Sequence, residues 1–121
     1  MRYEQSQPIV NGSMAGAITS SIIDLRNVID LSLIFSVTSA ASPTGTIAVL
    51  FADDCTFKAD GTINQSSGTF GADPSVTAPT LTANGVKALN VAETGHLFCK
   101  LVYTAGTGSG TLNVFAGTKG A

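Results

Sequence analysis

The side chains of this 121-residue sequence that could carry out acid–base or metal chemistry are few. His96 is the only histidine, and no partner lies beside it at the spacing of a metal site or a catalytic triad. Asp53 and Asp54 are adjacent, so on a strand their carboxylates would point to opposite faces and could not form a glycosidase pair. We therefore interpret His96 as a strand-end residue and the two aspartates as part of a solvated loop.

The run FKADGTIN resembles the middle of an EF-hand calcium loop. If Gly61 takes the sixth loop position, Thr56, Lys58 and Ser67 fall at positions that require oxygen ligands. Because one of these is a lysine and no helical pattern flanks the run, the sequence favours a β-turn at Asp60-Gly61.

Aromatic side chains offer little for ligand binding. Tyr3 and Tyr103 could contact a sugar, but the chain contains no tryptophan to form a stacking platform, and Tyr103 fits better as a strand aromatic. With no nucleophile beside a base, no phosphate loop and no metal spacing, we predict no catalytic residue, no metal, no cofactor and no small-molecule substrate. The chain is therefore predicted not to be an enzyme.

The two cysteines, Cys55 and Cys99, are predicted to be reduced thiols. Cys99 lies on an apolar strand face, where a thiol behaves as a small hydrophobe. Cys55 follows two aspartates, whose charge disfavours a thiolate. A disulfide would need Cα atoms within about 7 Å of each other, which the sequence leaves open.

The composition is poor in charge. Charged residues make up 12% of the chain, about half the usual share of ~25%, and Gly, Ser and Thr together make up about a third. Such a surface is weakly protected against association and suits a subunit of an assembly. The net charge is −2 and the basic residues are scattered, so nucleic-acid binding is not expected. No segment reads as a membrane span or a signal peptide, which predicts synthesis in the cytoplasm.

Apolar and polar residues alternate along most of the chain, which predicts strands and no helix. In Ile29–Thr38, for example, Leu31 and Leu33 alternate with Ser32 and Ile34. The predicted strands are Ala17–Leu25, Ile29–Thr38, Thr46–Ala52, Thr56–Ala59, Thr62–Asn64, Val76–Thr82 and Val86–Val91, with Asn84-Gly85 as a hairpin turn between the last two. Short strands with frequent turns indicate a single all-β domain, an antiparallel β-sandwich with jelly-roll-like features.

The stretch from His96 to Thr118 is predicted to organise the fold as a hairpin. Two strands with one apolar face each flank the turn TAGTGSGT, whose glycines at 106, 108 and 110 permit a chain reversal. An isolated hairpin is marginally stable in water, so the rest of the chain must cover its apolar face.

Two sets of apolar residues follow from the alternation. The predicted core comprises Leu31, Leu33, Phe35, Val37, Ile47, Val49, Phe51, Leu97, Cys99, Leu101, Leu112 and Val114. The opposite faces of the same strands carry Ile34, Leu50, Phe98, Val102 and Phe115. The second set is too large to be left in water, so it faces either another layer of this chain or a partner subunit.

Residues 1–13 are predicted to form an N-terminal arm or first short strand, ahead of the domain in residues 14–121. The segment is polar but contains four residues that could anchor it to a neighbour: Tyr3, Pro8, Ile9 and Val10. Such a segment could order by adding a strand to the exposed sheet edge of another subunit.

Two stretches, LSLIFSVTSAASPTGTIAVLFADDCTF and HLFCKLVYTAGTGSGTLNVFAGTKG, resemble small virion proteins of tailed bacteriophages. The resemblance covers about half of the chain and lies in its strand and turn patterns, and the part from Thr56 to Ala92 departs from it. It implies a β-sandwich or jelly-roll virion protein that decorates (cements) the capsid, with the major capsid protein as its partner. Because symmetry repeats each weak contact many times, we expect a homodimer or homotrimer on a symmetry axis. A tail or head-fibre component, or a receptor- or carbohydrate-binding module, is the alternative.

Overall fold

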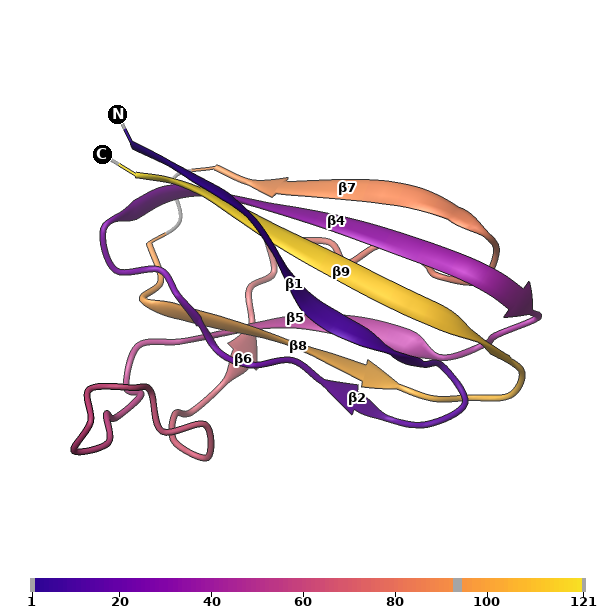
Figure 1. Ribbon diagram of the computed structural model, residues 1–121, viewed down its shortest axis with the longest axis horizontal. Helices are drawn as coiled ribbons and strands as arrows, with labels where there is room; N and C mark the ends of the chain where they lie inside the picture. Colours follow the sequence, from indigo (N-terminus) through magenta and orange to yellow (C-terminus); the bar gives the residue numbers. More distant parts are fainter. Residues whose placement is uncertain (1, 93–94, 121) are drawn as a thin grey trace.

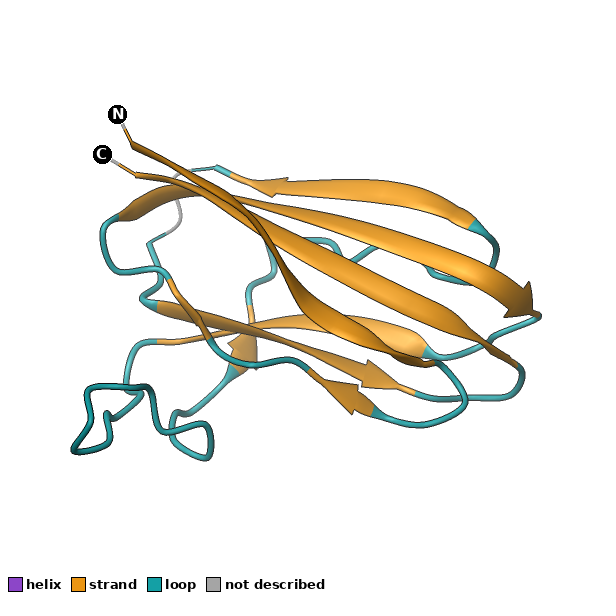
Figure 2. Cartoon of the chain, viewed as in Figure 1, coloured by secondary structure: helices purple, strands orange, loops and turns teal. Residues whose placement is uncertain are grey.

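The computed structural model describes residues 2–92 and 95–120, with their side chains from Val10 onward. The described residues form strands, turns and loops and contain no helix (Figure 2). The strands are β1 (Arg2–Ser13), β2 (Ile18–Thr19), β3 (Ile23–Asp24), β4 (Val28–Ala41), β5 (Thr46–Ala52), β6 (Gly71–Ala72), β7 (Gly85–Val91), β8 (Phe98–Thr104) and β9 (Ser109–Gly120). The predicted all-β class is confirmed.

The strands form two antiparallel sheets packed face to face (Figure 1). The front sheet has the order β1-β9-β4-β7, and the back sheet has the order β2-β8-β5-β6, with β3 also pairing with β8. When β2 and β3 are counted as one interrupted strand, the first strand pairs with the last, the second with the second-last, and so on inward to β5 and β6. This nested pairing, wrapped over two sheets, is a jelly roll.

The N-terminal segment is part of the sandwich. Along β1, the backbone pairs with β9 of the same chain from Arg2 opposite Gly120 to Ser13 opposite Thr111. Of the two forms expected for residues 1–13, an arm or a first short strand, the structure has the strand, which pairs within the same sandwich as the rest of the chain. The reason is that β9 would otherwise expose a full row of unpaired backbone groups at the sheet edge.

The predicted hairpin from His96 to Thr118 is wrong, because β8 and β9 belong to different sheets. The glycine-rich segment between them is an arch from the back sheet to the front sheet. Gly108 has φ 81°, and a Cβ at this position would collide with the Ser42 carbonyl. The arch lies against the β4–β5 arch, where the Thr44 amide donates to the Thr107 carbonyl at 3.0 Å. Because β8 and β9 lie in opposite sheets, the apolar face of each strand points into the core between the sheets.

The predicted strand Ala17–Leu25 is interrupted. Between β2 and β3, the Ser20 hydroxyl accepts a hydrogen bond from the Leu101 amide at 2.8 Å, and the Ser20 amide donates to the Leu101 carbonyl at 2.9 Å. A side-chain oxygen thus replaces a backbone acceptor, and the regular pairing breaks at that point.

The segment 76–82 was expected to be a strand paired with 86–91, and this is wrong. It crosses from the back sheet to the front sheet as a loop, and its own Leu81 side chain is buried in the core. Pro74 and Pro79 lack the amide hydrogen that a ladder needs. Likewise, 56–59 and 62–64 form only a single bridge, Phe57 with Ile63, around the predicted turn.

Eleven of the twelve predicted core residues are buried between the sheets, and Leu97 is the exception. Leu97 is 40% exposed because β8 begins one residue later, at Phe98, and the alternation does not extend back to it. Further core side chains come from outside the predicted set: Val10, Met14, Leu25, Leu81, Val91, Tyr103 and Ala116.

Candidate functional site

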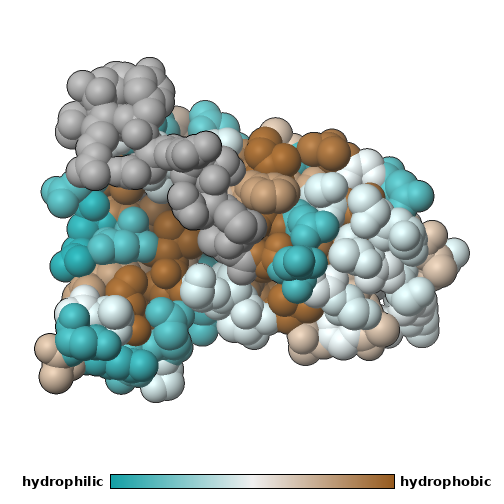
Figure 3. Space-filling view, in the orientation of Figure 1, coloured by the Kyte–Doolittle hydropathy of each residue, from teal (hydrophilic) through white to brown (hydrophobic). Residues whose placement is uncertain are grey.

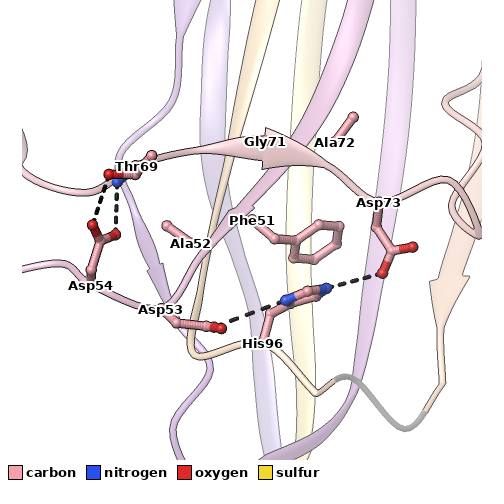
Figure 4. Close-up of a pocket in the computed structure, with 9 residues that line it drawn as sticks. All are labelled: Phe51, Ala52, Asp53, Asp54, Thr69, Gly71, Ala72, Asp73 and His96. Atoms are coloured by element: carbon pink, nitrogen blue, oxygen red, sulfur yellow. Dashed lines mark hydrogen bonds and ion pairs between the residues drawn. The ribbon is translucent and has the colours of Figure 1, made fainter.

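One pocket gathers most of the side chains with potential chemistry at one end of the sandwich. It has a volume of about 430 Å³ and lies between the end of β5, strand β6 and the start of β8 (Figure 4). Its lining consists of Phe51, Ala52, Asp53, Asp54, Thr69, Gly71, Ala72, Asp73 and His96. The pocket thus brings three carboxylates and one imidazole together in a chain that is poor in charge.

His96 is held on three sides. Its Nε2 lies 2.9 Å from Asp73 Oδ2, and its Nδ1 lies 3.9 Å from Asp53 Oδ1. The imidazole stacks on the Phe51 ring, with centroids 4.6 Å apart and planes 26° apart. In Figure 4 the ring lies between the two carboxylates and over the aromatic face. Both nitrogens are thus directed at carboxylates of this chain.

Asp73 is the more strongly bound of the two carboxylates. The hydrogen bond with His96 lowers the pKa of Asp73 to about 2, with smaller contributions from the Ser75 amide and hydroxyl. The Ser75 amide and hydroxyl donate to Oδ1 at 2.9 and 2.8 Å. Asp73 therefore stays ionised under all but strongly acidic conditions.

The adjacent Asp53 and Asp54 each secure a different backbone segment. Asp53 Oδ1 accepts from the Leu97 amide at 3.0 Å. Asp54 accepts from the Thr69 amide and hydroxyl at 2.7 and 2.8 Å, and these bonds lower the pKa of Asp54. The two residues lie after the end of β5 and are exposed, as the loop interpretation expected, and their carboxylates bind different partners.

This arrangement joins segments that are distant in sequence. The Ser75 hydroxyl donates to Asp73 Oδ1, while the His96 imidazole contacts the other oxygen of the same carboxylate. No group of three His, Cys, Asp or Glu side chains converges on a metal position within the described part of the chain. The Phe51 ring is buried and covered by His96, so it presents no open face to a sugar. These contacts hold the segment before β8 against the segments that follow β5 and β6.

Other predicted candidates are dispersed. Asp60 accepts from the Thr62 amide and hydroxyl in a turn where Gly61 has φ 88°, which agrees with the β-turn interpretation. Tyr103 is buried in the core. Cys55 and Cys99 are free thiols, as predicted, and burial raises the pKa of Cys99 to about 12 and also raises that of Cys55.

The four predicted interface residues all lie on β1. The side chains of Tyr3, Pro8 and Ile9 lie outside the described residues. Val10 is 5% exposed and packs in the core of its own chain, so it is not a free anchor for a neighbour.

Asp73, the main partner of His96, was missed by sequence reasoning, which placed it in a surface loop. The two residues are 23 positions apart, and no local pattern relates them. Only the pairing of β6 with β5 and of β5 with β8 brings the two segments to the same sheet end.

Comparisons with known proteins do not name a class for the chain: no protein family matches it, and no curated protein matches it significantly. Within residues 2–92 and 95–120, no helix is long and apolar enough to cross a membrane.

Proposed function

We propose that this chain is a structural virion protein of a tailed bacteriophage that decorates and stabilises the icosahedral capsid. The observation that carries the proposal is a charge-poor jelly roll whose front sheet exposes the apolar side chains of Val86 and Phe115. A rigid domain of this kind suits permanent contact with other subunits, and jelly rolls recur in viral capsid proteins. The expected partners are the major capsid protein and further copies of the chain, in a particle assembled in the host cytoplasm.

The resemblance to phage virion proteins falls on the structural framework of the fold. Its two stretches cover most of β4, β5, β8 and β9 and the two arches that join them. These arches contact each other at one end of the sandwich, where the Thr107 amide donates to the Thr44 hydroxyl at 2.7 Å. A resemblance that lies in strands and arches supports a structural role. It gives no information on catalysis, because a fold does not by itself determine function.

A tail or fibre component that binds a receptor or carbohydrate is the competing proposal, since jelly rolls also occur in lectins. The pocket around His96 is the natural place for such a ligand, with its three carboxylates. However, Asp54 and Asp73 are already bonded to Thr69 and Ser75, and the Phe51 ring is covered. The structural role is therefore favoured, and a clear hit on a glycan array would reverse this preference.

The test is the location of the protein in an imaged particle. Density on the capsid shell, repeated at symmetric positions, would support decoration. Density confined to the tail would overturn it, and absence of the chain from purified particles would overturn any virion role.

A further inference from the structure

The two outer faces of the sandwich differ in how they are covered. On the back sheet, Phe98 points outward but is only 2% exposed, because loop 53–70 folds back over it. Phe57 of this loop lies 6.0 Å from the Phe98 ring, and the Arg26 guanidinium lies 4.4 Å above Phe57. On the front sheet, by contrast, Val86 is 68% and Phe115 is 37% exposed.

Four outward-facing apolar residues of β4, β7 and β9 are neighbours on the front sheet. Ile34 lies directly opposite Phe115 on β9 and opposite Ala88 on β7. Val86 is two residues from Ala88 on the same face of β7. Directly opposite side chains in a sheet have Cβ atoms about 5 Å apart and therefore touch. We call these four residues, Ile34, Val86, Ala88 and Phe115, the front patch.

Among the described side chains of β4, β7 and β9, the immediate neighbours of the front patch carry no charge. The alternation along β4, β7 and β9 places small or amide residues around it: Ser32, Ser36, Asn90, Asn113 and Gly117. Asp30 and Lys119 lie on the same face toward its end, and their oppositely charged groups approach to 3.5 Å. Figure 3 shows apolar atoms over β7 and β4 on this side, among pale and polar residues. An apolar centre that includes an aromatic side chain and has a polar rim is typical of an interface core.

We propose that the front patch is the contact between two copies of this chain, packed face to face about a two-fold axis. In such an interface the same surface of both copies is in contact, so an unpaired charge near the axis would be repelled by the same charge of the second copy. The described side chains of this face avoid that repulsion, because the Asp30 and Lys119 charges offset each other. A strongly charged partner would find no complementary charge here. This inference rests on the proposed structural role and names the surface that the role would use.

The size of the face indicates how strong this contact is. Four strands about 4.8 Å apart and about seven residues long present roughly 450 Å² per copy, or about 900 Å² for the pair. Stable complexes bury about 1,200 Å² or more, so the isolated dimer is expected to be weak, with a dissociation constant in roughly the micromolar to millimolar range. The contact becomes effectively permanent only when each copy is also held by a larger assembly.

Sedimentation equilibrium of the full chain, from about 10 µM to about 1 mM, tests the proposal. The variant Val86→Glu places a charge at the most exposed patch position, where the proposed contact would bury it, and Phe115→Ser removes the aromatic side chain of the patch. Ala59→Glu, in the exposed loop on the back sheet, adds the same charge elsewhere and serves as the matched control. We expect reversible dimers for the wild type and the control, and a dissociation constant at least about tenfold higher for Val86→Glu.

A wild type that stays monomeric up to about 1 mM would overturn the proposal, as would dimers that both patch variants leave unchanged. If the wild type is monomeric but Val86→Glu abolishes binding to purified capsids, the patch belongs to a different partner and self-association is wrong. Dimerisation through the patch together with absence from particles would retain this inference and defeat the proposed function. If Phe115→Ser fails to fold, Val86→Glu still decides the outcome, because its side chain lies largely in solvent.

Discussion

The Tyr103 hydroxyl is a buried polar group whose partner is missing among the described residues. The side chain is 1% exposed, and the oxygen lies close to Gly45, where a Cβ would collide with it. An unsatisfied buried hydroxyl costs free energy, so we expect Tyr103→Phe to leave the free energy of unfolding unchanged or to raise it by about 1 kcal/mol. Urea denaturation measures this.

The control is Tyr103→Ala, which opens a cavity and should lower the free energy of unfolding by about 3–5 kcal/mol. A loss of more than about 1 kcal/mol in Tyr103→Phe would mean that the hydroxyl has a hydrogen-bond partner after all.

The Asp73–His96 contact makes stability depend on pH in a defined window. The folded pKa of Asp73, about 2, lies below its ordinary value of 3.8, so its contribution is fully present above about pH 4 and is lost as the pH falls toward 2. We expect His96→Gln to move the Asp73 pKa upward toward 3.8, which a carboxyl NMR titration measures directly. An Asp73 that titrates at the same pH in both proteins would contradict the assigned cause.

Strand β4 is the central element of the front sheet, between β9 and β7, and its inward face is fully buried. Leu33→Asp would place an unpaired carboxylate there, so we expect a loss of about 4 kcal/mol or more, enough to prevent folding. Thr38→Asp on the exposed face of the same strand should cost less than about 1 kcal/mol. Circular dichroism and urea denaturation compare the two. A soluble, equally stable Leu33→Asp variant would show that the strand faces are misassigned.

Strand β7 forms one edge of the front sheet, and Lys87 protects that edge. Lys87 lies opposite the buried Phe35, on the inward face, but its Nζ reaches along the edge to the Thr80 carbonyl at 2.6 Å and the Thr80 hydroxyl at 2.9 Å. An inward-pointing charge on an edge strand opposes pairing with another edge. We expect Lys87→Val to change the free energy of unfolding by less than about 1 kcal/mol but to increase aggregation.

Light scattering during incubation at high protein concentration measures this effect. Lys58→Val, in the exposed loop 53–70, removes the same charge away from any sheet edge and is the matched control. Equal aggregation of the two variants would show that net charge, and not edge protection, governs solubility.

At the scale of the whole molecule, the jelly roll makes the two ends of the chain neighbours, since Arg2 pairs with Gly120. We therefore expect β1 to unfold together with the rest of the sandwich. Hydrogen exchange should show the β1 and β9 amides of this ladder protected to a similar degree as those between β4 and β9. Rapid exchange along all of β1, with β4 protected, would restore the interpretation of residues 1–13 as an arm.

Deleting residues 2–10 tests the same point by stability. The truncation exposes the edge of β9 and removes Val10 from the core, so we expect a loss of several kcal/mol and a greater tendency to associate. An unchanged free energy of unfolding would show that β1 contributes nothing to the fold.

The sequence alone determined the strand class and most of the core. Side chains alternate along a strand whatever it pairs with, so the pattern in β4, β5, β8 and β9 identified the inward residues in advance. The turn at Asp60-Gly61 was also predictable, because glycine adopts its backbone geometry at little cost.

Only the tertiary structure decided which strands pair, and with that the site. The local sequence of a glycine-rich turn between two amphipathic strands is compatible with both a hairpin and an arch. In a hairpin the two apolar faces lie side by side in one sheet, whereas in an arch they face each other from opposite sheets. The arch places β8 and β9 in opposite sheets, and β1 then completes the front sheet. The His96–Asp73 contact and the open front patch follow from that pairing, since each joins residues that are distant in sequence and become neighbours only through the sheets.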